Sequence, residues 1–173
     1  MMMRETGAAA VCRYPVMDVR WTPYAGPQLV ATAEAQHFGI AGAGGASVHE
    51  FRPGGGAPGG RAGPGGGPSG GLEPVAFFPT PEGASCVAWS EQRPDQLLVG
   101  GGLGWVRLFS LLSGDDRAVG ALRAHAADVC RVKFKPLAKD AFLTAAADGL
   151  VRAWDPAVAF GGGGAAAAEG APQ

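Results

Sequence analysis

Short apolar runs alternate with polar residues along most of the chain, and Gly or Pro interrupts each run. Met17, Val19 and Trp21 alternate with Asp18, Arg20 and Thr22, and Pro23 follows them. A period of two is typical of a strand with one buried face, and Pro is excluded from central strands because it lacks an N–H donor. The pattern predicts an all-β protein. The expected strands cover residues 17–22, 29–33, 36–42, 47–51, 75–78, 86–90, 97–100, 105–109, 142–144 and 151–155, with one more around residue 130 and a candidate start at 156–160.

The stretch AFLTAAADGLVRAWD, at residues 141–155, has the clearest pattern. Asp148-Gly149 is a strong hairpin signal, because both turn positions need positive φ and these two residues tolerate it. The residues after the turn alternate again and end on Trp154-Asp155, the dipeptide that marks one blade of a β-propeller. This stretch therefore predicts a strand, a tight turn and a second strand.

The same pattern recurs earlier in the chain at a constant offset of 45 residues. The matched pairs are Trp89 with Phe134, Leu98 with Leu143, Gly104 with Gly149, Val106 with Val151, Arg107 with Arg152 and Phe109 with Trp154. Such a period lies in the range of WD40 repeats, about 40–45 residues. A first unit matches at an offset of 68, pairing Val19, Trp21 and Leu29 with Val87, Trp89 and Leu97. Three units of one pattern predict an incomplete WD40-type β-propeller of about three blades.

The segment between the first two units has an unusual composition. Of the twenty residues 52–71, eleven are Gly and four are Pro, so the segment has no apolar surface whose burial could offset its ordering entropy. We expect a flexible N-terminus at 1–13, a first blade at 14–51, a disordered Gly/Pro-rich insertion at 52–73, a second blade at 74–113, an unfinished third blade at 114–160 and a disordered tail at 161–173. Three blades cannot close a ring, so we expect two open flanks with exposed apolar faces and a poorly soluble isolated chain.

Four residues of the third unit suggest a buried polar chain. His125, Thr144, Asp148 and Trp154 stand where WD40-type blades join a loop His, a strand hydroxyl, the turn Asp and a strand Trp by hydrogen bonds. The chemistry is consistent, because an Asp drawn into a blade needs donors and the indole N–H needs an acceptor. The alternative is an ordinary β-hairpin with an unrelated His. The second unit lacks the His and has Val99, Leu103 and Phe109 at the other three positions, so apolar residues replace its polar chain.

The equivalent aromatic positions Trp21, Trp89 and Phe134 are expected in the core. Cys86 and Cys130 lie in predicted inner strands and are expected to be buried as small apolar groups.

Charge and cysteine content exclude several classes of function. The 14 Lys and Arg residues against 15 Asp and Glu residues lack the basic excess of a nucleic-acid or membrane-surface binder. The three cysteines are far apart and form no CxxC pair, which favours a reducing compartment over a zinc site or a disulfide framework. No run approaches the ~18 apolar residues of a membrane helix, and the N-terminus lacks the apolar core of a signal peptide. We expect no nucleic acid and no membrane insertion.

Motifs of catalysis are absent from the sequence as well. There is no G-x-S-x-G and no H-E-x-x-H, and the GxGxxG match at Gly54, Gly56 and Gly59 is not followed by a helix pattern. His37 and His49 are expected to be packed or exposed strand residues rather than ligands. The sequence therefore predicts no enzyme, no catalytic residue, no cofactor and no metal.

One stretch near the N-terminus resembles a particular family. The run LVATAEAQHFGIAGAGGASVHEF is similar to the opening blade of peroxin-7 proteins, with Ala31-Thr32-Ala33 and Gln36-His37-Phe38-Gly39-Ile40 matching the family pattern. The extra Glu34-Ala35 is a departure. The likeness extends over residues 14–51 and 74–158.

This resemblance implies a seven-bladed cytosolic receptor, of which the chain holds three blades at most. Peroxin-7 binds the type-2 peroxisomal targeting signal, an N-terminal amphipathic helix on cargo proteins. It then cycles to the peroxisome with a coreceptor and contacts docking proteins for import into the matrix. Members of the family carry a large aromatic residue just before the third-blade turn Asp, where this chain has Ala147.

A propeller binds peptides on the rim where the loops before the inner strands meet the hairpin turns. The rim candidates are Ser85, Leu103, Asp128 and Ala147. Asp128 is a carboxylate suited to an Arg-rich helix, with a solvated loop Asp as its alternative role. Two other functions stay open: a generic WD40 scaffold or adaptor in a protein complex, and an incomplete gene product without activity of its own.

Overall fold

The computed structural model describes residues 9–52, 71–91, 93–136 and 141–161. Within these ranges, eleven strands form three antiparallel sheets. The first sheet has the order β1-β2-β3-β4, with bounds Val16–Trp21, Leu29–Ala35, Gly44–Arg52 and Gly71–Thr80. The second has the order β5-β6-β7-β8, with bounds Ala84–Trp89, Gln96–Gly101, Trp105–Ser110 and Gly120–Arg123. The third has the order β11-β10-β9, where β9 is Val129–Phe134, β10 is Phe142–Ala146 and β11 is Val151–Trp154.

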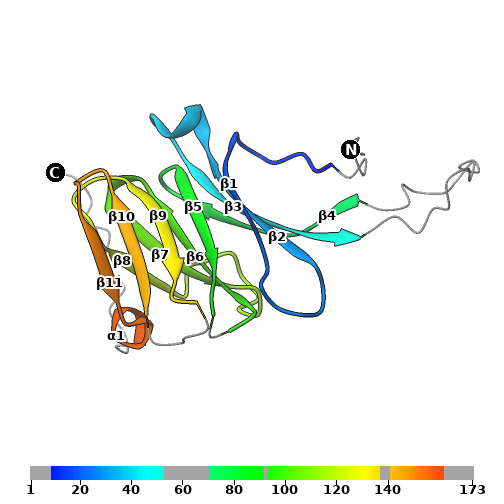
Figure 1. Ribbon diagram of the computed structural model, residues 1–173. Coiled ribbons are helices and arrows are strands. Elements are labelled where there is room, and N and C mark those ends of the chain that lie inside the picture. Colours follow the sequence, from blue (N-terminus) through cyan, green and yellow to red (C-terminus); the bar gives the residue numbers. More distant parts are fainter. Residues whose placement is uncertain (1–8, 53–70, 92, 137–140, 162–173) are drawn as a thin grey trace, which may run out of the picture.

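The sheets pack side by side, and their first strands β1, β5 and β9 are neighbours (Figure 1). One apolar core fills the junction between the first and second sheets, where Phe78 of β4 stacks on Phe109 of β7 with ring centroids 4.9 Å apart. A second core surrounds the buried Phe142, between the second and third sheets. The Trp89 Nε1–H also donates a hydrogen bond to the Arg20 carbonyl at 3.2 Å, which ties β5 to β1. The predicted all-β class is therefore confirmed.

The segment predicted as a strand at 36–42 is a turn instead. It contains the 3-10 turn η1 (Gln36–Gly39), in which His37 and Phe38 have positive φ of 47° and 56°. This left-handed backbone closes the β2–β3 hairpin and cannot continue a strand. The alternating apolar residues of the segment are consequently exposed at the end of the hairpin.

The candidate strand start at 156–160 is also wrong, because these residues lie in the helix α1 (Pro156–Gly161). Asp155 Oδ1 accepts the Ala157 N–H at 2.8 Å, and Pro occupies the first helical position. Both features are helix-start signals. The helix places Phe160 on Phe142, with ring centroids 5.8 Å apart, so α1 covers one end of the second core.

The described part of the predicted insertion differs from the expectation of disorder. Arg52 ends β3, and Gly71 to Glu73 begin β4, with Arg52 directly opposite Gly71 in the ladder. The Arg52 guanidinium pairs with Glu50 and with Glu73, at 2.9 Å in each case. Strand β4 therefore completes the first sheet, whereas the sequence assigned most of it to the second blade. Residues 53–70 lie outside the described residues.

Two residues expected in the core are exposed. Trp89 is buried, but the equivalent Trp21 is 57% exposed, and Cys130 is exposed while Cys86 is fully buried. The difference follows from position. Trp21 lies on the outer face of the first sheet, which faces no other sheet in the described structure, whereas Trp89 packs between the first and second sheets. Cys130 lies at a bulge where the β9–β10 ladder passes from Arg131 to Val129, so it does not occupy the position of Cys86.

Phe134, the third of the equivalent aromatic positions, is partly buried. Among the histidines, His49 is buried, and burial lowers its pKa.

The described end of the predicted flexible N-terminus contacts the outer face of the first sheet. The Tyr14 N–H donates to Glu34 Oε2 at 3.1 Å, and the Arg13 guanidinium lies over the Phe77 ring, 4.3 Å from its centroid. Cys12 Sγ lies 4.0 Å from Thr32 Oγ1. Residues 12–14 are therefore part of the fold, and residues 1–8 lie outside the described residues, as do residues 162–173 of the predicted tail.

Candidate binding rim and its supporting polar chain

The structure brings the four polar residues of the third sheet into one hydrogen-bonded chain. The Trp154 Nε1–H donates to Thr144 Oγ1 at 2.8 Å, and Thr144 Oγ1 lies 2.7 Å from His125 Nε2. The other ring nitrogen, His125 Nδ1, lies 3.0 Å from Asp148 Oδ2. Because the indole can only donate and the carboxylate can only accept, a neutral His125 protonated on Nδ1 completes the chain in one direction, from Trp154 to Asp148.

Asp148 also fixes the turn and the loop that face each other. Its carboxylate accepts the Leu150 N–H at 3.0 Å and the Ala126 N–H at 3.2 Å. Desolvation favours the neutral acid, but the donors Leu150, His125 and Ala126 together outweigh it and lower the pKa of Asp148 below its ordinary value. The carboxylate therefore joins the β10–β11 turn to the loop before β9.

The second sheet has no polar chain at the same place. Val99 and Phe109 occupy the positions of Thr144 and Trp154 and are almost fully buried. Since both partners of each hydrogen bond are replaced together, no buried donor or acceptor is left unpaired.

The first sheet has a polar cluster that the sequence analysis missed. Glu34 is fully buried on the outer face of β2, where Thr32 Oγ1 donates to Glu34 Oε1 at 3.0 Å and Ser47 Oγ forms a very short contact to the same oxygen. Trp21 pairs with Val30 in the ladder, whereas Trp89 pairs with Leu97. The β1–β2 connection is therefore one residue longer, which moves Thr32 onto the face that carries Thr144 in the third sheet. Leu29 follows Trp21 at the same spacing as Leu97 follows Trp89, so the sequence carries no signal of this shift.

The three hairpin turns differ in backbone as well as in side chains. Phe38 and Leu103 have positive φ and Asp148 does not, so the expectation of positive φ at both positions of the Asp148-Gly149 turn is wrong. Phe38, Leu103 and Asp148 each stand before a Gly with φ near 80°. Leu103, in the 3-10 turn η2 (Gly102–Gly104), has φ of 56°, and a non-Gly residue in this region is under strain. Phe38 is 72% exposed and Leu103 is 63% exposed.

The four predicted rim residues lie along one seam between the second and third sheets. Asp128 Oδ1 accepts the Leu103 N–H at 2.8 Å, and the Asp128 carbonyl accepts the Ala147 N–H at 2.9 Å. Ser85 Oγ donates to the carbonyl of Val129, the first residue of β9. Asp128 is therefore more than a solvated loop residue, because its carboxylate supports the η2 turn.

Among the described residues, no cluster of three or more His, Cys, Asp or Glu side chains has the geometry to hold a metal ion. No helix in the described ranges is both long enough and apolar enough to cross a membrane. Burial raises the pKa of the Cys86 thiol to about 11, so this cysteine stays protonated at neutral pH.

Three neighbouring antiparallel sheets whose first strands line one side define the class of this fold: an incomplete WD40-type β-propeller. No family model matches the sequence. A chain in the crystal structure of an active polycomb repressive complex 2 in the basal state superposes with a TM-score of 0.59 at 15% identity, over 81% of this chain and 27% of that chain. At that identity the match shows the fold alone.

A second comparison identifies the relationship more closely. Over 138 residues, 79% of this chain, the sequence is 30% identical to peroxisome biogenesis protein 7 of Arabidopsis thaliana. The chain is thus related to the peroxin-7 family, as its opening motif predicted. It spans 39% of the length of that relative.

Proposed function

We propose that this chain is part of a non-enzymatic receptor for peroxisomal protein import. The observation that carries this proposal is the 30% identity to peroxisome biogenesis protein 7 over most of the chain. The receptor binds the type-2 targeting signal of cargo proteins in the cytosol and cycles to the peroxisome. There it acts with a coreceptor and with the docking proteins of the import machinery.

The rim supports binding of an amphipathic helix that carries Arg and Leu. Leu103 supplies an exposed apolar side chain, and Asp128, which bonds to its N–H, supplies a carboxylate beside it. Within the described part of the chain, Asp128 Oδ2 accepts no hydrogen bond, so it is available to a guanidinium. Phe38 and Ile40, 72% and 88% exposed, extend the apolar surface along the β2–β3 turn.

Peptide binding tests this function. A fluorescein-labelled type-2 signal peptide is titrated with the chain, and a scrambled peptide of the same composition is the control. We expect the signal peptide to bind at least tenfold more tightly. Leu103→Ser and Asp128→Asn should each weaken binding several-fold, whereas Leu112→Ser, at another exposed Leu in the β7–β8 connection, should not.

A generic WD40 scaffold is the second candidate. It is favoured by Asp128, whose Oδ1 is already occupied by the Leu103 N–H, and by Ala147 in place of the aromatic residue of the family. Equal affinity for the signal peptide and the scrambled peptide would support the scaffold and contradict the receptor.

A further inference from the structure

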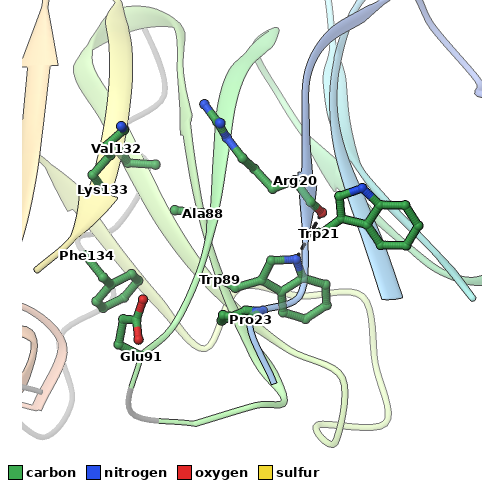
Figure 2. A pocket seen from close by; sticks show the side chains of 9 residues that line it. All are labelled: Arg20, Trp21, Pro23, Ala88, Trp89, Glu91, Val132, Lys133 and Phe134. Carbon is green, nitrogen blue, oxygen red and sulfur yellow. Dashed lines mark hydrogen bonds between the residues drawn. The ribbon is translucent and has the colours of Figure 1, made fainter. Parts of the chain in front are cut away.

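A pocket of about 190 Å³ lies among the first strands of the three sheets (Figure 2). The rim residues Ser85 and Asp128 stand at the starts of β5 and β9, and Leu103 and Ala147 bond to Asp128 from the hairpin turns. The pocket is lined by the last residues of β1, β5 and β9. None of the four rim residues lines it. The pocket is therefore a second candidate site on the molecule, separate from the rim.

Three lining residues occupy one equivalent position in the repeats. Arg20, Ala88 and Lys133 are separated by the offsets of 68 and 45 residues that relate the units, and they come from β1, β5 and β9 in turn. Figure 2 shows Arg20 and Lys133 on either side of Ala88. The small middle residue leaves open space between two cations.

The aromatic positions that follow form an apolar wall. Trp89 is 5% exposed and its N–H is already bonded to the Arg20 carbonyl, so the indole contributes only apolar surface to the pocket. Phe134 of β9 is the equivalent residue, and Glu91 lies beside it in Figure 2. The pocket thus has a cationic part around Ala88 and an apolar part that ends at one carboxylate.

The positive charge of the cationic part is largely available. Arg20 lies 3.3 Å from Asp18 Oδ1, but Asp18 also accepts the N–H groups of Val19 and Val87, so the guanidinium keeps further donors. Lys133 forms no ion pair within the described ranges and is exposed. Since the whole chain has a net charge of -1, attraction of an anion to this place is local and is not an effect of the overall charge.

We propose that this pocket binds an acidic peptide segment of a partner protein. One carboxylate of the segment lies between Arg20 and Lys133, and a neighbouring apolar side chain packs on Trp89 and Phe134. Glu91 disfavours a second carboxylate at the apolar end. The site is independent of the targeting signal, so a partner bound here leaves the rim free for cargo.

Fluorescence anisotropy with the full chain tests the proposal. The probe is a blocked, fluorescein-labelled peptide Gly-Glu-Phe-Glu-Ser-Gly, compared with its Gln counterpart. We expect the Gln peptide to bind about fivefold more weakly, the effect of losing one partly exposed ion pair. Lys133→Glu should weaken binding of the Glu peptide at least tenfold, and Glu91→Gln should strengthen it about twofold.

Arg123→Glu on β8 is the matched control, because it makes the same charge change on an exposed strand position outside the pocket. Far-ultraviolet circular dichroism checks that each variant is folded. Equal loss of binding in Lys133→Glu and Arg123→Glu would overturn the proposal, since it would show non-specific attraction. Equal affinity for the Glu and Gln peptides, or no binding of either, would also overturn it. A failure of the rim to bind the targeting signal would leave this result unaffected.

Discussion

The second and third sheets follow one repeat pattern, and each hairpin turn contains a Gly with φ near 80°. They differ in how the loop before the first strand is connected to that turn. In the third sheet, a chain of four polar side chains runs from Trp154 to Asp148. The second sheet has Val99 and Phe109 in the interior, and its turn residue Leu103 is exposed. In the second sheet all partners of the polar chain are replaced together, so no buried donor or acceptor is left unpaired there.

The largest effect on stability is expected from a substitution in the apolar interior of the second sheet. Phe109→Ala removes a ring that is 1% exposed and stacked on Phe78, so it leaves a cavity between two sheets. We expect the free energy of unfolding to fall by about 3–5 kcal/mol. Urea unfolding followed by circular dichroism measures the change, and Leu112→Ala, at an exposed position, is the control. A loss below about 1 kcal/mol would show that the two sheets are not packed as described.

The next largest effect on stability is expected from a substitution at the centre of the polar chain in the third sheet. His125→Ala removes a partner from Thr144 and from Asp148, and Thr144 is 1% exposed. We expect a loss of about 1–3 kcal/mol, because a buried hydroxyl loses its acceptor while the Trp154 donor stays in place. His37→Ala, on an exposed turn, is the control in the same urea measurement and should change stability little. Equal effects of the two substitutions would contradict the polar chain.

Val99 and Thr144 occupy equivalent positions in the second and third sheets, so exchanging the two residue types tests the polar chain directly. Val99→Thr adds a buried hydroxyl where no His or Trp can pair with it, and Thr144→Val leaves the Trp154 N–H without its acceptor. Both substitutions keep the side-chain shape, so a packing model predicts no change in either. We expect each to cost about 1–2 kcal/mol by thermal or urea unfolding. A neutral Thr144→Val variant would show that the polar chain adds nothing over an apolar core.

The repeat pattern predicts the strand alignment correctly where two units have connections of equal length. It fails where one connection has an extra residue, because the strand register then shifts. The 45-residue offset aligned the second and third sheets correctly, because their first two strands are separated by the same spacing. In the first sheet the offset of 68 matched Leu29 to Leu97, but the ladder pairs Trp21 with Val30. One extra residue turns every following side chain to the other face.

Burial failed to follow the repeat for a related reason. The exposed Trp21 and the buried Trp89 have the same place in the pattern, but only Trp89 has a neighbouring sheet on its face in the described structure. The pattern shows which face a side chain occupies. It does not show whether another sheet covers that face.

A substitution in the hairpin turn of the second sheet is expected to raise the free energy of unfolding slightly, whereas the substitutions above lower it. Leu103 holds φ of 56°, which an L-residue adopts at a cost, and its side chain is exposed, so little packing is lost on removing it. Leu103→Gly should therefore raise the free energy of unfolding by up to about 1 kcal/mol, while weakening any ligand that uses the Leu side chain. Gly104→Ala is the contrasting variant, because a Cβ there collides with the His125 carbonyl and should destabilise the chain strongly.

The smallest expected effect on stability is the acid dependence of the third sheet, because it rests on the single carboxylate of Asp148. Its hydrogen bonds lower its folded-state pKa below the value of about 3.9 for an unfolded Asp. The stabilisation is thus fully present above about pH 4 and is lost as the pH falls through the folded-state pKa, since the unfolded chain then binds the proton first. Urea midpoints measured between pH 7 and pH 2.5 should fall less steeply in Asp148→Asn than in the parent chain. Identical slopes in Asp148→Asn and the parent chain would show that the carboxylate is not ionised in its hydrogen-bonded position. The control is Asp115→Asn, in an exposed loop, which should leave the parent slope unchanged.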